Sequence, residues 1–314
     1  MELVPNLAGQ VTLTGNDLTV TSPEVPAVKL PVLQKYQWIT QPLTVMAAVL
    51  NPAVTTKLNV YLLKGGLQSA LQQISQQVAP LLSAKPAADG SVAPVTIDPA
   101  TLADGIYTLA GFGLGQNENI GGMALRLLVV DKAPVFSDVP ATQWARQWVD
   151  ALSYLGVVNG RGAGTFAPGA EVTRAEFAKM LALAIGLKPA SGNDFADVPD
   201  DWSRPYIEAL YQAKLVTGEM ANGQRYFYPT RSISRAEAAT IIGRSQGVTD
   251  GAYTVGNTGF TDFNQVPTWA QHAVVVLTQR LLITGFPDNT FRPLQTLHRD
   301  QAAKILGGVV GIGQ

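Results

Sequence analysis

The feature that most constrains the fold is an internal repeat in the second half of the 314-residue chain. Six markers recur three times in the same order: Phe-x-Asp, Trp, Gly, Phe-x-Pro, Arg and a second Gly. The first Gly always follows the Trp by 16 residues, the Arg follows the Phe of Phe-x-Pro by 8, and the second Gly follows the Arg by 12. The units open at Phe136, Phe195 and Phe260. This self-similarity predicts three copies of one supersecondary unit.

Each unit is predicted to contain two short helices joined by a turn-rich loop. In the first helix, apolar residues follow the Trp by 5 and 8 positions, which places one apolar stripe on the helix surface. The stripes comprise Trp144, Val149 and Leu152; Trp202, Ile207 and Leu210; and Trp269, Val274 and Leu277. Because a helix pair this short cannot bury its own stripe, we expect the units to share one core in a pseudo-threefold, all-α arrangement.

The second helix of each unit has recognisable ends. In the first two units, a hydroxyl residue followed three positions later by Glu predicts a capping box, and a Gly suits the left-handed position after the helix. These signals are Thr173-x-x-Glu176 with Gly186 and Ser234-x-x-Glu237 with Gly247. The third unit has His298-x-x-Gln301 in the same places, so we expect a weaker N-cap there.

Residues 1–132 have a different pattern, in which short apolar runs are separated by turn signals such as Gly15-Asn16-Asp17. The runs predict strands and together favour an immunoglobulin-like β-sandwich. They are Val11–Thr14, Leu18–Val20, Leu43–Met46, Leu58–Leu62, Ile106–Leu109 and Leu125–Val130. Helical spacing of apolar residues predicts a helix inserted at residues 67–82, and residues 84–94 are expected to form an exposed loop.

Composition argues against several classes of function. The formal net charge of -1 gives no basic field for nucleic acid, and no apolar run is long enough for a membrane span. The chain has no Cys and 2 His residues, which excludes thiolate chemistry and a histidine-rich metal site. It also lacks a Gly-x-Ser-x-Gly elbow and a phosphate-binding loop. We expect no catalytic residues, cofactor or metal, although carboxylate pairs for glycoside hydrolysis stay open.

The Arg of each unit occupies an electrostatically poor position. It lies in the first turn of the second helix, where the helix dipole disfavours a cation by roughly 0.3 to 1 kcal/mol. A guanidinium beside free helix amides can bind a carboxylate or phosphate, which predicts an anion site. The alternative is that each Arg pairs with a nearby acid and only pins a loop to the helix. The arginines are Arg174, Arg235 and Arg299, and the alternative partners are Asp138, Asp197 and Asp262.

Three other sets of residues allow two interpretations each. The Trp side chains either belong to the core or stack half-exposed on sugar rings. The first Gly of each unit, Gly160, Gly218 or Gly285, either permits a positive φ angle or lets the backbone approach a ligand. The acids Asp194, Asp197, Asp200 and Asp201 could bind calcium, but helix capping explains them more simply.

The three units resemble S-layer homology domains, whose pattern runs Phe-x-Asp-Val, Trp-Ala, apolar-x-Gly, Asp-Gly-Thr-Phe-x-Pro and Thr-Arg-Ala-Glu. The matching segments are Phe136–Val139, Trp144-Ala145, Thr165–Pro168 and Thr173–Glu176; Phe195–Val198 and Ser234–Glu237; and Trp269-Ala270 and Gly285–Phe291. The resemblance covers three domains at residues 134–190, 193–250 and 258–314. The second unit has three extra residues between Gly218 and Arg235, so its groove is expected to be altered or unused.

The resemblance implies grooves between repeats that bind a secondary cell-wall polysaccharide, often pyruvylated, or peptidoglycan. A pyruvate ketal carries the carboxylate that the arginines would bind. The implied glycan contacts are Asp138, Trp144, Gly160, Arg174, Asp197, Trp202, Gly218, Arg235, Asp262, Trp269, Gly285 and Arg299.

The expected role is anchoring of a protein at the extracellular cell surface. Residues 1–5 do not resemble a signal peptide, so either the peptide has been removed or the chain is cytosolic. One alternative function is a lattice or envelope-tethering protein that contacts other S-layer subunits. Another is an anchored enzyme with a catalytic centre in residues 1–132, whose acids are few and scattered.

Overall fold

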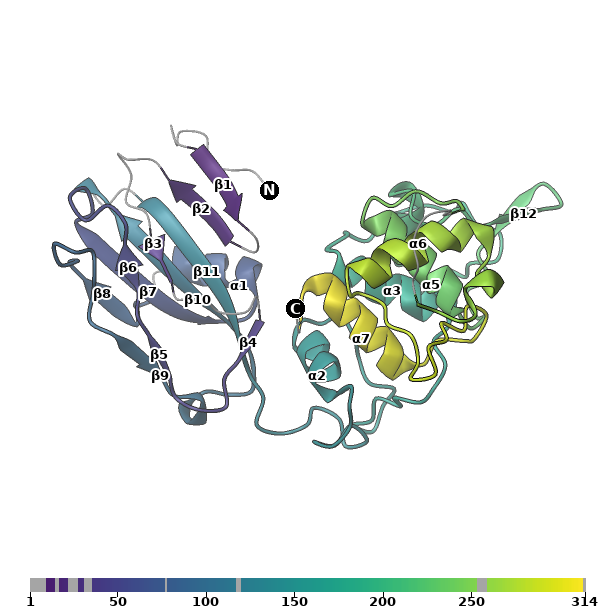
Figure 1. Cartoon of the computed structure of the whole chain (residues 1–314), viewed down its shortest axis with the longest axis horizontal. Helices are drawn as coiled ribbons and strands as arrows, with labels where there is room; N and C mark the ends of the chain where they lie inside the picture. Colours follow the sequence, from purple (N-terminus) through teal and green to yellow (C-terminus); the bar gives the residue numbers. More distant parts are fainter. Residues whose placement is uncertain are drawn as a thin grey trace. The chain divides into compact units, whose positions relative to one another are not determined.

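The computed structural model divides the chain into two compact units after Ala133. The N-terminal unit is rich in strands and the C-terminal unit is helical (Figure 1). The structure describes residues 10–14, 17–21, 28–30, 36–76, 78–116, 120–252 and 259–312.

A five-stranded sheet forms the centre of the N-terminal unit. Its strands, in spatial order, are β4 (Tyr36–Trp38), β11 (Ile120–Val130), β10 (Gly105–Leu114), β7 (Lys57–Lys64) and β8 (Leu82–Ala84). The pairs β11–β10, β10–β7 and β7–β8 are antiparallel, whereas β4 runs parallel to β11. All ten residues of β10 are buried, so this central strand is covered on both faces.

Shorter strand pairs accompany this sheet. They are β1 (Gln10–Thr14) with β2 (Asp17–Thr21), β3 (Val28–Lys29) with β6 (Ala48–Val49), and β5 (Leu43–Val45) with β9 (Val95–Ile97). A side chain at Gly111 of β10 would place its Cβ 2.9 Å from Cγ1 of Val28, so β3 packs closely over the sheet. Val28, Val45, Leu58 and Leu109 belong to the core between these strands.

The predicted strands are confirmed, with one helix shorter than expected. The turn at Gly15-Asn16 lies outside the described residues, but the flanking strands pair Thr14 with Asp17. Helix α1 covers Leu67–Ser75 rather than residues 67–82, and a short 3-10 helix follows later at Pro99–Thr101. Pro80 prevents the helix from continuing to residue 82, because proline lacks an amide hydrogen and disfavours helical conformation in the residue before it.

The C-terminal unit contains two α-helices per repeat, as predicted. They are α2 (Arg146–Tyr154) and α3 (Arg174–Ala184); α4 (Arg204–Gln212) and α5 (Arg235–Ser245); and α6 (Thr268–Gln279) and α7 (Arg299–Val310). The extra residues of the second repeat form a hairpin of β12 (Glu219–Ala221) and β13 (Gln224–Tyr226), and the third repeat adds a 3-10 turn at Phe263–Gln265. Figure 1 shows the hairpin projecting from the helices of this unit.

The helices pack between repeats rather than within them. Helix α4 packs on α3, α6 packs on α5, and α2 packs on α7, so the first repeat contacts the last (Figure 1). The segments before the second helices also bond in a cycle. Val172 N–H donates to the carbonyl of Leu297, Leu297 N–H to Ile233, and Ile233 N–H to Val172, each at 2.9 Å. No repeat is therefore a self-contained helix pair.

The predicted stripes are buried except at their tryptophans. The six later stripe residues, from Val149 to Leu277, are fully buried, and the three Trp side chains lie at the surface. Both predicted capping boxes form, with Thr173 and Ser234 accepting from the amide three residues later. The third N-cap has a longer bond, because His298 N–H donates to Oε1 of Gln301 at 3.3 Å, compared with 2.9 Å for the equivalent bonds to Glu176 and Glu237.

Candidate ligand-binding groove

The Asp of each Phe-x-Asp holds the Phe-x-Pro segment of its own repeat. Its two carboxylate oxygens accept backbone amides of the Phe and of the following residue, at 2.7 to 2.8 Å in all three repeats. The acceptors are Asp138, Asp197 and Asp262, and the donors are the amides of Phe166 and Ala167, Phe227 and Tyr228, and Phe291 and Arg292. These carboxylates, predicted as glycan contacts, are thus occupied by backbone donors.

The conserved spacing from Trp to Gly reflects a close contact with the first Phe of the repeat. A Cβ at Gly160 would lie 2.8 Å from Cε1 of Phe136 and 2.7 Å from the carbonyl of Thr165, and the other two glycines face equivalent atoms. Gly218 alone of the three has a positive φ, at 65°. Packing against the phenyl ring therefore requires glycine at these positions.

Each helix-start Arg is buried and reaches into the next repeat. Nε of Arg174 donates to the carbonyl of Phe227 at 2.8 Å, Nε of Arg235 to Phe291 at 2.7 Å, and Nε of Arg299 to Phe166 at 2.8 Å. The guanidinium carbon also lies 4.3 to 4.8 Å from the centre of the same phenyl ring. The sequence offered the Asp as the alternative partner of each Arg, but the observed partner is a backbone carbonyl. This carbonyl belongs to the Phe of the Phe-x-Pro segment. It is free to accept from the Arg because the Asp binds only the amides of that segment.

The three arginines differ at Nη1. Nη1 of Arg174 lies 2.8 Å from Glu237, and Nη1 of Arg299 lies 3.7 Å from Glu176. Arg235 donates from Nε and Nη2 to carbonyl groups, and its Nη1 forms no hydrogen bond or ion pair with another described residue. Burial and then the charge of Arg292 lower the pKa of Arg235 to about 10, while Asp262 opposes this effect.

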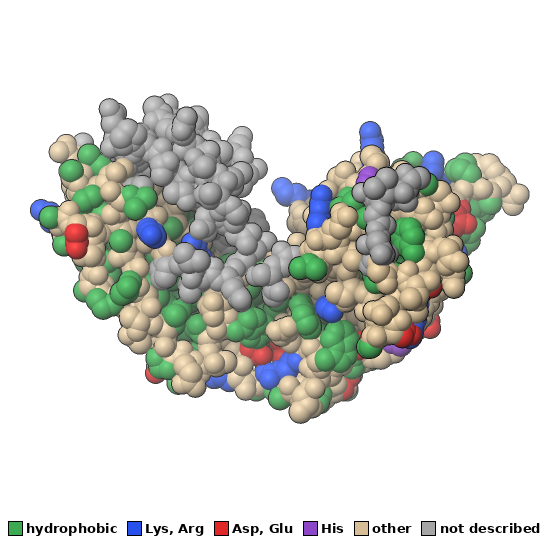
Figure 2. Space-filling model, viewed as in Figure 1, with side chains coloured by type: hydrophobic (Ala, Val, Ile, Leu, Met, Phe, Trp, Pro, Cys, Tyr) green, Lys and Arg blue, Asp and Glu red, His purple; other side chains and the backbone are tan. Residues whose placement is uncertain are grey.

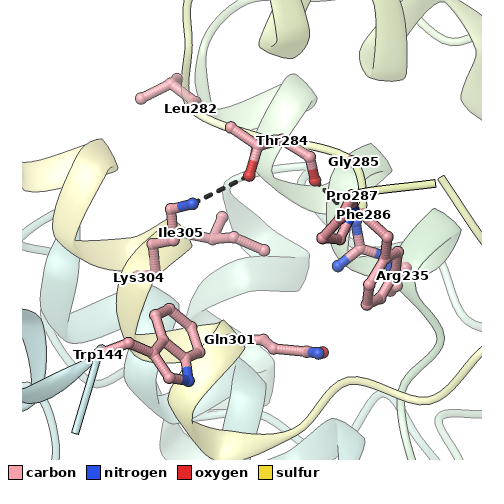
Figure 3. Close-up of a pocket in the computed structure, with 10 residues that line it drawn as sticks. All are labelled: Trp144, Arg235, Leu282, Thr284, Gly285, Phe286, Pro287, Gln301, Lys304 and Ile305. Atoms are coloured by element: carbon pink, nitrogen blue, oxygen red, sulfur yellow. Dashed lines mark hydrogen bonds between the residues drawn. The ribbon is translucent and has the colours of Figure 1, made fainter. Parts of the chain in front are cut away.

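A pocket of about 170 Å³ lies beside Arg235 (Figure 3). We name it the α5–α7 groove; its lining is Trp144, Arg235, Leu282, Thr284, Gly285, Phe286, Pro287, Gln301, Lys304 and Ile305. The resemblance implies grooves between repeats without specifying which residues share one groove. This groove takes Trp144 from the first repeat, Arg235 from the second and Gly285 from the third, because the helices pack between repeats.

Sequence reasoning missed Gln301 and Lys304, which both point toward this groove from α7 (Figure 3). Lys304 Nζ donates to Oγ1 of Thr284 at 3.0 Å. In the sequence, Lys304 is marked only by its position in the same predicted helix, five residues after Arg299. That position could not be linked to a groove without knowing which repeats pack together.

The tryptophans are half-exposed, as one of the two interpretations expected. Trp144 is 51% exposed, Trp202 50% and Trp269 43%, so each indole offers surface to a ligand. At Trp202, Nζ of Lys179 lies 5.2 Å from the ring centre, and Trp144 contacts Trp148 with ring centres 6.1 Å apart.

The second repeat modifies its groove, as its extra residues suggested. Arg225 from strand β13 donates to the carbonyl of Thr217. The equivalent carbonyls, those of Thr284 and Asn159, accept instead from the helix-start residues Arg235 and Arg299. An additional side chain thus occupies the position beside Gly218.

The acidic residues near 194–201 have local roles. Asp201 accepts the amide and hydroxyl of Ser203, which lowers its pKa, and Asp197 clamps Phe227. Among the residues that the structure describes, no group of three or more acids or histidines could hold a metal ion. Figure 2 shows acidic and basic side chains scattered over the visible described surface, without one large basic patch.

The C-terminal unit is a helical unit of three repeats, in which residues of different repeats line one groove between helices. The S-layer homology domain model matches residues 135–178, 194–239 and 259–303. This part of the chain therefore consists of three tandem S-layer homology domains.

Several curated relatives match part of this chain. An S-layer protein of Bacillus thuringiensis subsp. finitimus is 31% identical over 179 residues, covering 54% of this chain and 21% of the relative. The exoglucanase XynX of Acetivibrio thermocellus is 30% identical over 186 residues, covering 58% and 17%. An endoglucanase of Bacillus sp. (strain KSM-635) is 31% identical over 173 residues, covering 54% and 18%.

The chain thus spans about a fifth of the length of these curated relatives. These relatives carry different names, although each matches more than half of this chain. In the described part of this chain, no helix has the length and apolar character needed to cross a membrane.

Proposed function

We propose that this protein anchors itself to the bacterial cell wall by binding an anionic, carboxylate-bearing wall polysaccharide in grooves between its repeats. The observation that carries the proposal is the α5–α7 groove, which places a buried guanidinium, an ammonium group and a half-exposed indole around one cavity. Charged donors bind a carboxylate strongly, and an indole face packs on a sugar ring. The S-layer proteins among the relatives support a location at the cell surface.

The same proposal includes the fold of each unit, taken by itself. The cyclic hydrogen bonds at Val172, Ile233 and Leu297 support a pseudo-threefold arrangement of the repeats. The layered strands of the N-terminal unit support an immunoglobulin-like sandwich, which the repeats would hold at the surface.

We propose a binding role without catalysis. In the N-terminal unit, Asp89 accepts from Ser91, Asp98 caps the 3-10 helix, and Asp104 accepts the amide of Ala133. These hydrogen bonds stabilise turns, and they account for the three acids without a catalytic role. A lattice-forming role is the second candidate, favoured by exposed apolar side chains at Met46 and Leu50, which are 70% and 52% exposed.

Calorimetric titration of the full chain with purified wall polysaccharide tests the proposal. We expect saturable binding that is lost when mild acid removes the pyruvate ketals, because the carboxylate leaves with the ketal. Binding that survives this treatment would contradict the role of the carboxylate. No binding to either preparation would favour the lattice or a peptidoglycan tether.

A further inference from the structure

The three grooves are unequal at the third residue of the second helix. This residue is Glu176 in α3, Glu237 in α5 and Gln301 in α7. In all three helices its side chain accepts the N-cap amide, so Gln301 preserves the cap while removing a negative charge.

The third residue of each second helix faces the Arg that begins the second helix of another repeat. Nη1 of Arg299 is near Glu176 at 3.7 Å, and Nη1 of Arg174 is near Glu237 at 2.8 Å. At these two places the protein itself supplies a carboxylate for the guanidinium. In the α5–α7 groove the neutral amide of Gln301 lies in the lining with Arg235, and Nη1 of Arg235 forms no hydrogen bond or ion pair with another described residue.

A second cation lies in the α5–α7 groove. Lys304 lies in its lining, and burial together with the charge of Arg235 lowers the pKa of this lysine. Two like charges around one cavity repel each other, and an anion between them relieves that repulsion. The equivalent lysine of α3, Lys179, lies over the rings of Trp202 and Tyr206, and the equivalent residue of α5 is the buried Thr240.

We propose that the α5–α7 groove is the anion-selective groove of this protein, and that Gln301 and Lys304 are its specificity-determining residues. The inference rests on the proposed function, and it adds that one carboxylate-bearing sugar binds per chain. In this groove the ligand's carboxylate takes the place that Glu176 and Glu237 take in the other two. The indole of Trp144, at the opposite side of the lining, packs on the sugar ring (Figure 3).

The test is calorimetric titration of the full-length protein with wall polysaccharide fragments that retain their carboxylates. Gln301→Glu places in this groove the carboxylate found in the other two, and we expect at least about tenfold weaker binding, because like charges a few ångströms apart repel. Lys304→Met removes the second cation and should weaken binding by about tenfold as well. Gln224→Glu adds the same charge on the exposed hairpin and serves as the matched control.

Gln301→Glu should not unfold the protein, since it recreates the capping box of α3 and α5. Its denaturation midpoint therefore separates loss of binding from loss of structure. One site per chain, weakened by Gln301→Glu and unaffected by Gln224→Glu, supports the assignment. Wild-type binding that Gln301→Glu leaves unchanged overturns the assignment of the groove but not the anchoring function. Failure of the wild type to bind overturns both.

Discussion

Substitution of Arg299 by methionine tests whether the helix-start arginines close the ring of repeats. Arg299 is 4% exposed and donates to the carbonyls of Phe166 and Asn159 at 2.8 and 2.7 Å, which joins the third repeat to the first. Methionine keeps the apolar stem of the side chain but loses both bonds. A hydrogen bond from a charged donor contributes about 1.5 to 3 kcal/mol, so we expect Arg299→Met to lower the free energy of unfolding by about 3 to 5 kcal/mol.

Urea denaturation followed by the far-ultraviolet circular dichroism of the helices measures this change. Arg280→Met is the matched control, because Arg280 is exposed and makes one long hydrogen bond of 3.3 Å to the carbonyl of Gln246. We expect the control to change stability by less than about 0.5 kcal/mol. Equal effects of the two substitutions would refute the structural role and would mean that the Arg is retained mainly for a ligand.

Three further predictions concern the repeat region. Asp262→Asn should lower the free energy of unfolding by about 2 kcal/mol, because the amide group opposes one of the two backbone donors; Asp200→Asn, at a 98% exposed side chain, is its control in the same urea titration. Thr173→Ala should cost about 1 kcal/mol through loss of the N-cap, measured by thermal denaturation, and an unchanged midpoint would contradict the capping role. Burial raises the pKa of Glu208 above its usual 4.5; the backbone amide of Asp194 opposes this effect, and the side-chain hydrogen bond and charge of Asp194 add to it. The folded state therefore binds a proton more tightly than the unfolded state, and the wild type loses stability as pH rises through the folded pKa. Glu208→Gln should therefore be more stable than the wild type at pH 7, and this gain should shrink below pH 4.5; a gain that is independent of pH would refute the explanation.

The unequal grooves suggest how a repeat protein can lose symmetry without losing its fold. The residues that close the ring occur in every repeat, since each Asp clamps a backbone segment and each Arg bonds to its carbonyl. The residues that are not shared by all three repeats leave those contacts intact: Gln301 and Lys304 line the α5–α7 groove, and Arg225 lies beside Gly218. Ligand specificity can therefore change at one groove while the shared core is preserved.

The sequence by itself determined the number of units, the two helices in each and the ends of the second helices in the first two units. These features depend on local spacing: capping at Thr173 and Ser234, and left-handed glycines at Gly186 and Gly247, which have φ angles of 72° and 75°. It also located most strands of the N-terminal unit. It overextended α1, because apolar residues continue at helical spacing to Val78 whereas the helix ends at Ser75.

Only the tertiary structure decided which repeats the site residues join. Spacing along the chain groups Trp144 with Arg174, whereas packing of α2 on α7 places Trp144 in one groove with Arg235 and Gly285. A helix with one apolar stripe can bury it against any equivalent partner, and a sequence of near-identical units does not specify which one. The arrangement is fixed by contacts between residues more than a hundred positions apart, such as Arg299 with Phe166, and no local pattern contains that information.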